Sequence, residues 1–202
     1  MGRKASLHRQ PGNGLLTASI DKIFEESGAV LHGHFLLASG RHSPVYWEKF
    51  RVIQDPCSTV KLCGMIAEHY KSKNVDVVAG PTTGGVVLAY EVARQLGVCC
   101  AFAEKIDGGR TFRRGVAIGS GQRVLIVDDI LSTGTSVRDV IAAVKNEGGQ
   151  IVGVAVLVDR SDQSFDLGVP LFACLRSATV SYGPDVCPLC RDGLPLTKLG
   201  GI

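Results

Sequence analysis

Between Val75 and Leu175 the chain alternates short apolar runs, Gly-rich turns and stretches with helical spacing. The apolar runs, which we expect to be strands, cover 75–79, 98–103, 123–129, 151–158 and 171–175. Helices are expected from the turn at 80–85 to about Leu96, and over 135–147. Strands that are apolar throughout are typical of a parallel sheet covered by helices on both faces. The pattern therefore predicts an α/β fold with an open, mainly parallel twisted sheet flanked by helices.

The N-terminal quarter has a different pattern. Apolar residues at helical spacing predict a helix over 14–27, and the Gly- and Pro-interrupted run 29–52 predicts a small hairpin or meander. A further helix is expected over 58–73, with Ser58 as its N-cap. We expect residues 1–13 to be a flexible arm and 14–202 a single domain. Its parts are a flap (about 14–52), a core (about 58–176) and a C-terminal tail (about 177–202).

Composition excludes several classes of protein. The 202 residues are 45% hydrophobic and 20% charged, which excludes wholesale disorder. The 22 Lys and Arg against 19 Asp and Glu leave a net charge of only +3, so we expect no nucleic-acid partner. The chain has no apolar run long enough for a transmembrane helix, so we expect no membrane partner either. Seven cysteines, mostly in apolar runs, predict reduced thiols and a cytoplasmic location.

The segment Val124–Ser136 carries the clearest chemical signal. A buried strand would end in Asp128-Asp129, and the turn Ser132-Thr133-Gly134 would lead into a helix. Backbone N–H groups, hydroxyls and a helix N-terminus together bind phosphate, and adjacent carboxylates suit a pair of sugar hydroxyls or a metal carried by the ligand. The segment is neither a Walker A loop nor a Gly-x-Gly-x-x-Gly turn. The alternative is a strand end whose Asp residues only cap the next helix.

Two further segments fall near the same edge of the predicted sheet. Residues 79–85, Ala-Gly-Pro-Thr-Thr-Gly-Gly, join a strand to a helix, and the alternative is an ordinary turn. Residues 104–115 hold four cations and three glycines without hydrophobic periodicity. This second segment predicts a mobile loop that delivers positive charge, with a solvated surface loop as the alternative; Arg113 and Arg114 could be structural.

Val124–Ser136 resembles the phosphoribosyl-pyrophosphate (PRPP) motif of the type I phosphoribosyltransferases, and the order of elements resembles that family too. The resemblance implies that Asp128 and Asp129 hold the ribose hydroxyls and that the following turn cradles the 5-phosphate. It also implies a pyrophosphate-binding loop at 79–85 and catalytic roles for Lys105, Asp128 and Asp129. The implied PRPP-binding residues are Thr82, Thr83, Gly84, Lys105, Arg110, Asp128, Asp129, Ile130, Leu131, Ser132, Thr133, Gly134, Thr135 and Ser136.

The flap resembles that of the orotate phosphoribosyltransferases, whose pattern Phe-x-Leu-x-Ser-Gly-x-x-Ser matches residues 35–43. The resemblance, which covers roughly 15–160, implies orotate binding by Ser39, Gly40, Ser132 and Arg160. Arg160 also follows a predicted strand, where its guanidinium could pair with a carboxylate. The alternative at that strand end is a structural ion pair of the preceding aspartate.

The chain departs from this family at three places. Ala38 and Gly84 stand where many relatives carry Lys, and the cationic loop lacks the Lys-x-His-Gly pattern. The resemblance still implies transfer of phosphoribose from PRPP to orotate in pyrimidine biosynthesis. It implies that Mg²⁺ arrives with PRPP rather than in a protein-only cage, and that a homodimer shares the cationic loop between subunits. A phosphoribosyltransferase for another base and a PRPP-sensing regulator are the alternatives.

The tail contains a Cys-x-x-Cys pair, Cys187 and Cys190. The pair supplies two ligands, whereas a structural zinc ion needs four, and Cys174 is a possible third. The five histidines, His8, His32, His34, His42 and His69, are not expected to form a ligand cluster, although His34 and His42 lie near the flap.

Overall fold

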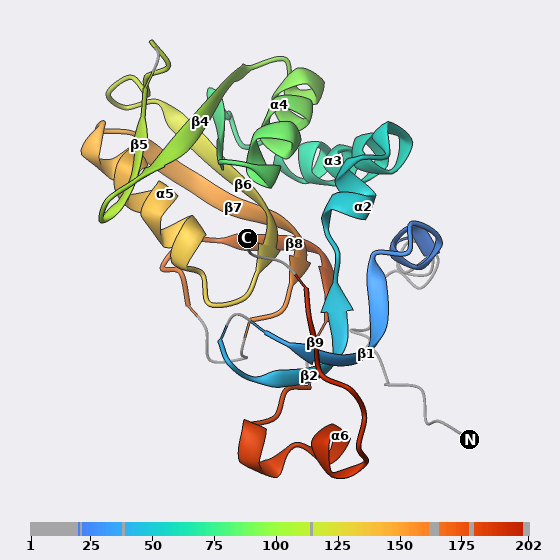
Figure 1. Cartoon of the computed structure of the whole chain (residues 1–202). Helices are drawn as coiled ribbons and strands as arrows, with labels where there is room; N and C mark the ends of the chain where they lie inside the picture. Colours follow the sequence, from blue (N-terminus) through green and yellow to red (C-terminus); the bar gives the residue numbers. More distant parts are fainter. Residues whose placement is uncertain are drawn as a thin grey trace.

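The computed structural model describes Ile20 and residues 22–37, 39–113, 115–161, 166–177 and 180–199. These residues form two sheets, a six-stranded sheet in the order β5-β4-β3-β6-β7-β8 and a three-stranded sheet in the order β2-β1-β9 (Figure 1). The predicted arm, residues 1–13, lies outside the described residues. None of the helices in these ranges is long and apolar enough to cross a membrane.

The six-stranded sheet confirms the predicted α/β class. Its parallel strands are β3 (Val77–Pro81), β4 (Cys99–Ile106), β6 (Arg123–Leu131), β7 (Gln150–Asp159) and β8 (Leu171–Arg176). Successive buried side chains of the central strand β6 pack on opposite faces: Leu125 and Val127 join one apolar cluster, and Val124 and Ile126 join the other. Both faces are therefore covered, which explains why the strand sequences are apolar throughout.

Helices supply the covering layers on the two faces. The side chains of α3 (Pro56–Tyr70) and α4 (Gly84–Leu96) belong to one cluster, and those of α5 (Thr135–Asn146) belong to the other. Figure 1 shows α3 and α4 on one side of the sheet and α5 on the opposite side. In a parallel sheet of this kind, every strand-to-helix turn lies at the carboxyl edge, the edge where the strands end.

The three-stranded sheet contains the predicted hairpin and part of the tail. Strands β1 (Val30–Leu36) and β2 (His42–Trp47) are antiparallel, and β9 (Thr197–Lys198) lies parallel to β1. We call the sheet β2-β1-β9 the hood. The short helices α2 (Phe50–Ile53), η1 (Pro184–Val186) and α6 (Pro188–Arg191) complete the elements. The tail, expected as a separate part, thus pairs with the flap.

Several predicted boundaries are wrong for identifiable reasons. Helix α3 is capped by Asp55 rather than Ser58, because the Asp55 carboxylate accepts hydrogen bonds from the backbone N–H groups of Cys57 and Ser58, with Pro56 at the first helical position. Strand β3 begins at Val77 rather than at 75. The described part of the N-terminal helix covers Ile20 and 22–26.

The expected mobile loop at 104–115 is largely a β-hairpin. Strand β4 continues to Ile106, and β5 (Gly109–Phe112) pairs antiparallel with it, with Ile106 opposite Gly109. The turn is Asp107-Gly108, a dipeptide that is typical of tight hairpins. Buried Phe112 anchors the returning strand to the α5 side of the core.

Candidate active site

The end of β6 holds two adjacent buried carboxylates. Asp128 and Asp129 are only 6% and 3% exposed. The N–H of Asp129 donates to Asp128 Oδ1 at 2.8 Å, and the N–H of Ile130 donates to Asp129 Oδ1 at 2.7 Å. Burial, followed by the charge of Asp129, raises the pKa of Asp128 to about 7. The fold therefore keeps two carboxyl groups close together where their negative charge is costly, which is typical of a functional site.

The turn after β6 exposes donors beside these carboxylates. Ser132, Thr133 and Thr135 are exposed, and the hydroxyls of Thr133 and Thr135 lie 3.2 Å apart. Gly134 caps α5 with a φ of 75°, which residues other than Gly rarely adopt. Unpaired N–H groups at the start of this 12-residue helix carry partial positive charge. The turn therefore presents the hydroxyls and N–H groups on which the prediction of a phosphate site rests, and that role stays a prediction.

The loop at 82–85 lies directly against the carboxylates. A Cβ built on Gly84 would come within 2.2 Å of Asp129 Oδ2, so in this chain a side chain at position 84 would have to displace that carboxylate. The Thr82 N–H donates to the carbonyl of Ala103 at 3.1 Å, and the Thr82–Thr83 peptide bond is cis. Two segments that are separate in sequence therefore meet at one place, as their common position at strand ends predicts.

The β4–β5 hairpin brings cations to this loop. Arg110 Nη1 donates to Thr82 Oγ1 at 3.2 Å and to the Ala103 carbonyl at 3.0 Å. Its buried Nε has no hydrogen-bond partner among the described residues. Lys105 is exposed and pairs in register with Arg110 across the hairpin. Like charges directly opposite are unfavourable without an anion between them.

A depression of about 490 Å³ adjoins the hairpin and is lined by Lys105, Ile106, Asp107 and Arg113. Arg114 lies outside the described residues.

Arg160 follows β7, the neighbour of β6. Its N–H donates to the Leu131 carbonyl at 2.8 Å. The pKa of its guanidinium is lowered, because the effect of burial is larger than the opposite effect of Tyr46 in the hood. The alternative ion pair belongs to the preceding residue: Asp159 Oδ2 lies 3.5 Å from Arg176 Nε. The structural ion pair is therefore formed by Asp159 and Arg176, and Arg160, the candidate for reading the base, is not part of it.

The hood turn carries the other predicted base-binding residues. Ser39 and Gly40 are exposed in the turn between β1 and β2. The Gly40 N–H already donates to the Leu37 carbonyl at 2.9 Å, so it is occupied within the turn. Ser43, which matched the flap pattern, is fully buried and donates to the carbonyls of Val45 and Val180. Ser43 is therefore a structural residue, and Ala38 lies outside the described residues.

Sequence reasoning missed Lys49. Its ammonium lies 2.9 Å from Asp129 Oδ2 and 3.0 Å from Oδ1, and so connects the segment after the hood to the end of β6. Its charge also lowers the pKa of Asp128, against the larger effect of burial. Asp129 is 80 residues away in sequence, and no local pattern marks a lone Lys after a hairpin as its partner.

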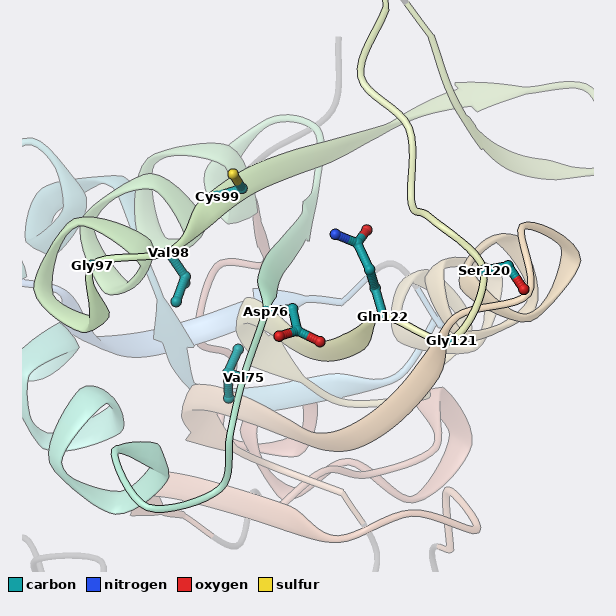
Figure 2. A pocket seen from close by; sticks show the side chains of 8 residues that line it. All are labelled: Val75, Asp76, Gly97, Val98, Cys99, Ser120, Gly121 and Gln122. Carbon is teal, nitrogen blue, oxygen red and sulfur yellow. The ribbon is translucent and has the colours of Figure 1, made fainter.

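A second depression, of about 820 Å³, lies at the opposite, amino edge of the sheet (Figure 2). It is lined by Val75, Asp76, Gly97, Val98, Cys99, Ser120, Gly121 and Gln122. Asp76 is exposed and accepts a hydrogen bond from the Arg123 N–H at 2.8 Å. The predicted site residues all lie elsewhere, so we assign no chemistry to this depression.

The expectation that the histidines form no ligand cluster is wrong. His34 and His42 lie with Cys187 and Cys190, and their four ligand atoms are within 4.8 Å of one another. The paired strands of the hood and the return of the tail bring them together, which local sequence does not reveal. Cys174 is not part of this group, and His8 lies outside the described residues.

Comparisons with known proteins agree with this geometry. Residues 55–167 match the phosphoribosyl transferase domain family. The chain is 47% identical over 178 residues to the orotate phosphoribosyltransferase of Pelotomaculum thermopropionicum, covering 88% of this chain and 94% of that protein. It is 45% identical over 179 residues to the orotate phosphoribosyltransferase of Caldicellulosiruptor bescii, covering 89% and 94%.

Among solved structures, the orotate phosphoribosyltransferase of Aeropyrum pernix superposes with a TM-score of 0.67 at 28% identity, covering 78% of this chain and 93% of that one. The matched domain includes both the 82–85 loop and the end of β6 with its turn. On these similarities, together with the fold and the site, the chain belongs to the phosphoribosyltransferase family, and within it to the orotate phosphoribosyltransferases.

Proposed function

We propose that this chain transfers the phosphoribosyl group of PRPP to orotate, a step of pyrimidine biosynthesis. The bond between ribose C1 and pyrophosphate breaks, and C1 forms a bond to a ring nitrogen of orotate, which loses its proton. The products are orotidine 5′-monophosphate and pyrophosphate. The observation that carries the proposal is the convergence of buried Asp128 and Asp129 with Gly84 of the neighbouring strand-to-helix turn, which lies directly against the Asp129 carboxylate.

The site's own residues are suited to positioning rather than to acid–base chemistry. The N–H groups and hydroxyls of Thr133–Ser136 would bind the 5-phosphate, and Asp128 and Asp129 would accept the ribose hydroxyls. Arg110 and Lys105 would face the pyrophosphate, whose negative charge grows as it leaves. Preorganised charge and fixed orientation then supply the rate.

Mg²⁺ fits this site as an ion that arrives with PRPP. Magnesium keeps several water or phosphate ligands and uses few carboxylates. Within the described residues, the Asp128–Asp129 pair belongs to no cluster of three or more metal-ligating side chains, and Lys49 already neutralises Asp129. When bound, the ion would offset the charge of the leaving pyrophosphate. Asp128 and Asp129 are the residues that would hold the ion's ligand shell in place.

Orotate differs from other pyrimidine bases by its carboxylate. Arg160 lies one strand from the carboxylates of β6, and its partly buried guanidinium can form two charge-assisted hydrogen bonds with a carboxylate. Ser132 would contact the base from the β6 turn, and Ser39 would contact it from the hood. This arrangement favours orotate over a purine or uracil, and turnover would distinguish the enzyme from a PRPP-sensing regulator.

Pyrophosphate release from PRPP tests the proposal across a panel of orotate, uracil, adenine and guanine, with and without Mg²⁺. We expect release with orotate and Mg²⁺ only. Release with another base would mean that this base, rather than orotate, is the substrate. Binding of PRPP without release of pyrophosphate for any base would favour the regulator.

We also propose a homodimer that shares the hairpin of Lys105 between subunits. Lys105 is exposed at the edge of the sheet, whereas Arg110 contacts Thr82 of its own chain. Mixing a Lys105→Ala chain with an Asp128→Asn chain should then restore part of the activity, because a hybrid dimer holds one intact site. If subunits exchange and no activity returns, Lys105 acts within its own chain.

A cytoplasmic location is proposed from the cysteines. All seven lie within the described residues and are free thiols, with Cys63 and Cys174 buried in the core. Fractionation of cells with an antibody to the protein tests this location.

A further inference from the structure

The hood and the tail together build a four-residue cluster that the proposed reaction does not use. His34 lies in β1, His42 begins β2, and Cys187 and Cys190 lie at the start and within the short helix α6. His34, His42 and Cys187 are buried and Cys190 is exposed, so the cluster is closed on the inside and open to solvent at one ligand. Each residue type is a common ligand of zinc.

The distances within the cluster match a tetrahedral site. His34 Nε2 lies 3.1 Å from His42 Nδ1. Cys187 Sγ and Cys190 Sγ lie 3.6 and 3.7 Å from His34 Nε2, and Cys190 Sγ lies 3.3 Å from His42 Nδ1. Around a tetrahedral zinc ion, ordinary bond lengths place two nitrogens about 3.3 Å apart and a nitrogen and a sulfur about 3.6 Å apart. The four atoms therefore surround a space of the right size for one ion.

The tautomer of His34 is also set for metal binding. Its Nδ1 lies 2.8 Å from the carbonyl oxygen of Leu194, and a carbonyl only accepts, so Nδ1 carries the proton. The lone pair of Nε2 then points at the cluster. Zinc-ligating histidines commonly donate their second ring N–H in this way, which fixes the ring and strengthens the ligand.

We propose that His34, His42, Cys187 and Cys190 bind one structural Zn²⁺ ion. Two thiolates and two neutral imidazoles balance the double charge of the ion, so the buried site is neutral. Binding would displace the two thiol protons to solvent. Four protein ligands leave no open position for substrate, so the role is structural rather than catalytic.

The ion would fasten the tail to the hood. The contacts outside the cluster that join these parts include the short β1–β9 pairing, the bridge between His42 and Tyr182, the bonds from Arg41 to Ser181, and the hydrogen bonds of Ser43 and His34 to the carbonyls of Val180 and Leu194. His34 and His42 flank the turn that carries Ser39 and Gly40, so the ion would also fix the base of that turn. The metal site itself does not depend on the proposed reaction.

The metal content of the full chain tests this proposal. The protein, made without an affinity tag and kept reduced, should contain about one zinc ion per chain. After removal of the zinc ion, Co²⁺ should bind in its place and give the visible bands typical of tetrahedral cobalt together with a thiolate-to-cobalt charge-transfer band. This measurement uses the unmodified chain, so it does not depend on whether a variant folds.

Variants assign the ligands. Cys190→Ser and His34→Asn should lose the ion and the cobalt bands, and their thermal unfolding should no longer respond to zinc. Cys99→Ser and His32→Asn are matched controls, because both residues are exposed and outside the cluster, and they should keep about one ion per chain.

Two results would overturn the proposal. One is a wild-type protein that binds neither zinc nor cobalt under reducing conditions. The four side chains would then form only a hydrogen-bonded cluster. The other is freshly isolated protein whose mass shows a Cys187–Cys190 disulfide and which stays metal-free after reduction.

Discussion

The two edges of the main sheet differ in how they treat charge. At the carboxyl edge, Asp128 and Asp129 are buried side by side, and a Cβ on Gly84 would meet the Asp129 carboxylate. At the amino edge, Asp76 is exposed and is paired with the backbone of Arg123 on the adjacent strand. The larger of the two depressions lies at the amino edge, yet the buried pair of carboxyl groups, with the raised pKa of Asp128, lies at the carboxyl edge. Buried, crowded charge therefore locates the site better than the size of a depression does.

Removing one carboxylate from each edge gives the largest expected contrast. Asp128→Asn should lower kcat/KM by about 10²-fold or more, because it removes a preorganised contact with the ribose. Asp76→Asn, the matched control at the amino edge, should keep kcat/KM within about twofold of wild type, because surface changes away from a site have small effects. Steady-state kinetics with orotate and PRPP measure both, and equal losses in the two variants would contradict the distinction between the edges.

Filling the space at each edge gives the next contrast. Gly84→Ala places a Cβ against Asp129 Oδ2 and must displace that carboxylate, so we expect at least a tenfold loss of kcat/KM, or about 1.4 kcal/mol. In Gly119→Ala the nearest atom is the flexible end of Gln122, at 3.2 Å, and activity should be unchanged. Wild-type kinetics for Gly84→Ala would mean that the contact between the loop and Asp129 has no role in turnover.

Base discrimination tests whether Arg160 belongs to the carboxyl-edge site. Losing a charged hydrogen bond costs about 1.5–3 kcal/mol, or roughly 10–150-fold. Arg160→Leu should lose most of the preference for orotate over uracil while it keeps its affinity for PRPP. Arg176→Leu is the control, because Arg176 pairs with Asp159 at the neighbouring strand end. If Arg160→Leu still discriminates fully between orotate and uracil, Arg160 does not bind the orotate carboxylate.

The smallest expected effect is on stability, and its sign is opposite to that on activity. Burial raises the pKa of Asp128 to about 7, so between its ordinary pKa and pH 7 the folded chain holds a proton that the unfolded chain has lost. The free energy of unfolding therefore falls as pH rises through this window. Asp128→Asn lacks this loss and should be about 1 kcal/mol more stable than wild type at pH 8, a rise in Tm of about 2–4 °C.

Urea unfolding at pH 5 and pH 8 measures this difference. The stability advantage of Asp128→Asn should be smaller at pH 5 than at pH 8. An advantage that is absent at both values would mean that Asp128 is ionised without penalty in the fold.

The sequence was most informative where structure is local. The apolar runs predicted the parallel sheet, and Asp128 to Ser136 marked the strand end and its turn, because these signals lie within a few consecutive residues. The β4–β5 hairpin was missed although Asp107-Gly108 is a turn signal, since the strand residues around it do not alternate clearly.

Long-range contacts could not be predicted in this way. Lys49 meets Asp129 because the fold brings the segment that follows the hood to the end of β6. The histidines at 34 and 42 meet the cysteines at 187 and 190 only because β9 returns to pair with β1. Pairing between the two ends of a chain depends on the whole fold, which no local spacing encodes.

Hydrogen exchange with and without PRPP and Mg²⁺ tests most directly whether the carboxyl edge is the site. The account predicts slower exchange in peptides covering 82–86 and 130–137, because the ligand would bind the N–H groups of these turns. Peptides covering 73–76 and 119–123, at the amino edge, should exchange as in the free protein. Protection at 119–123 with none at 130–137 would contradict the assignment and move the site to the opposite edge of the sheet.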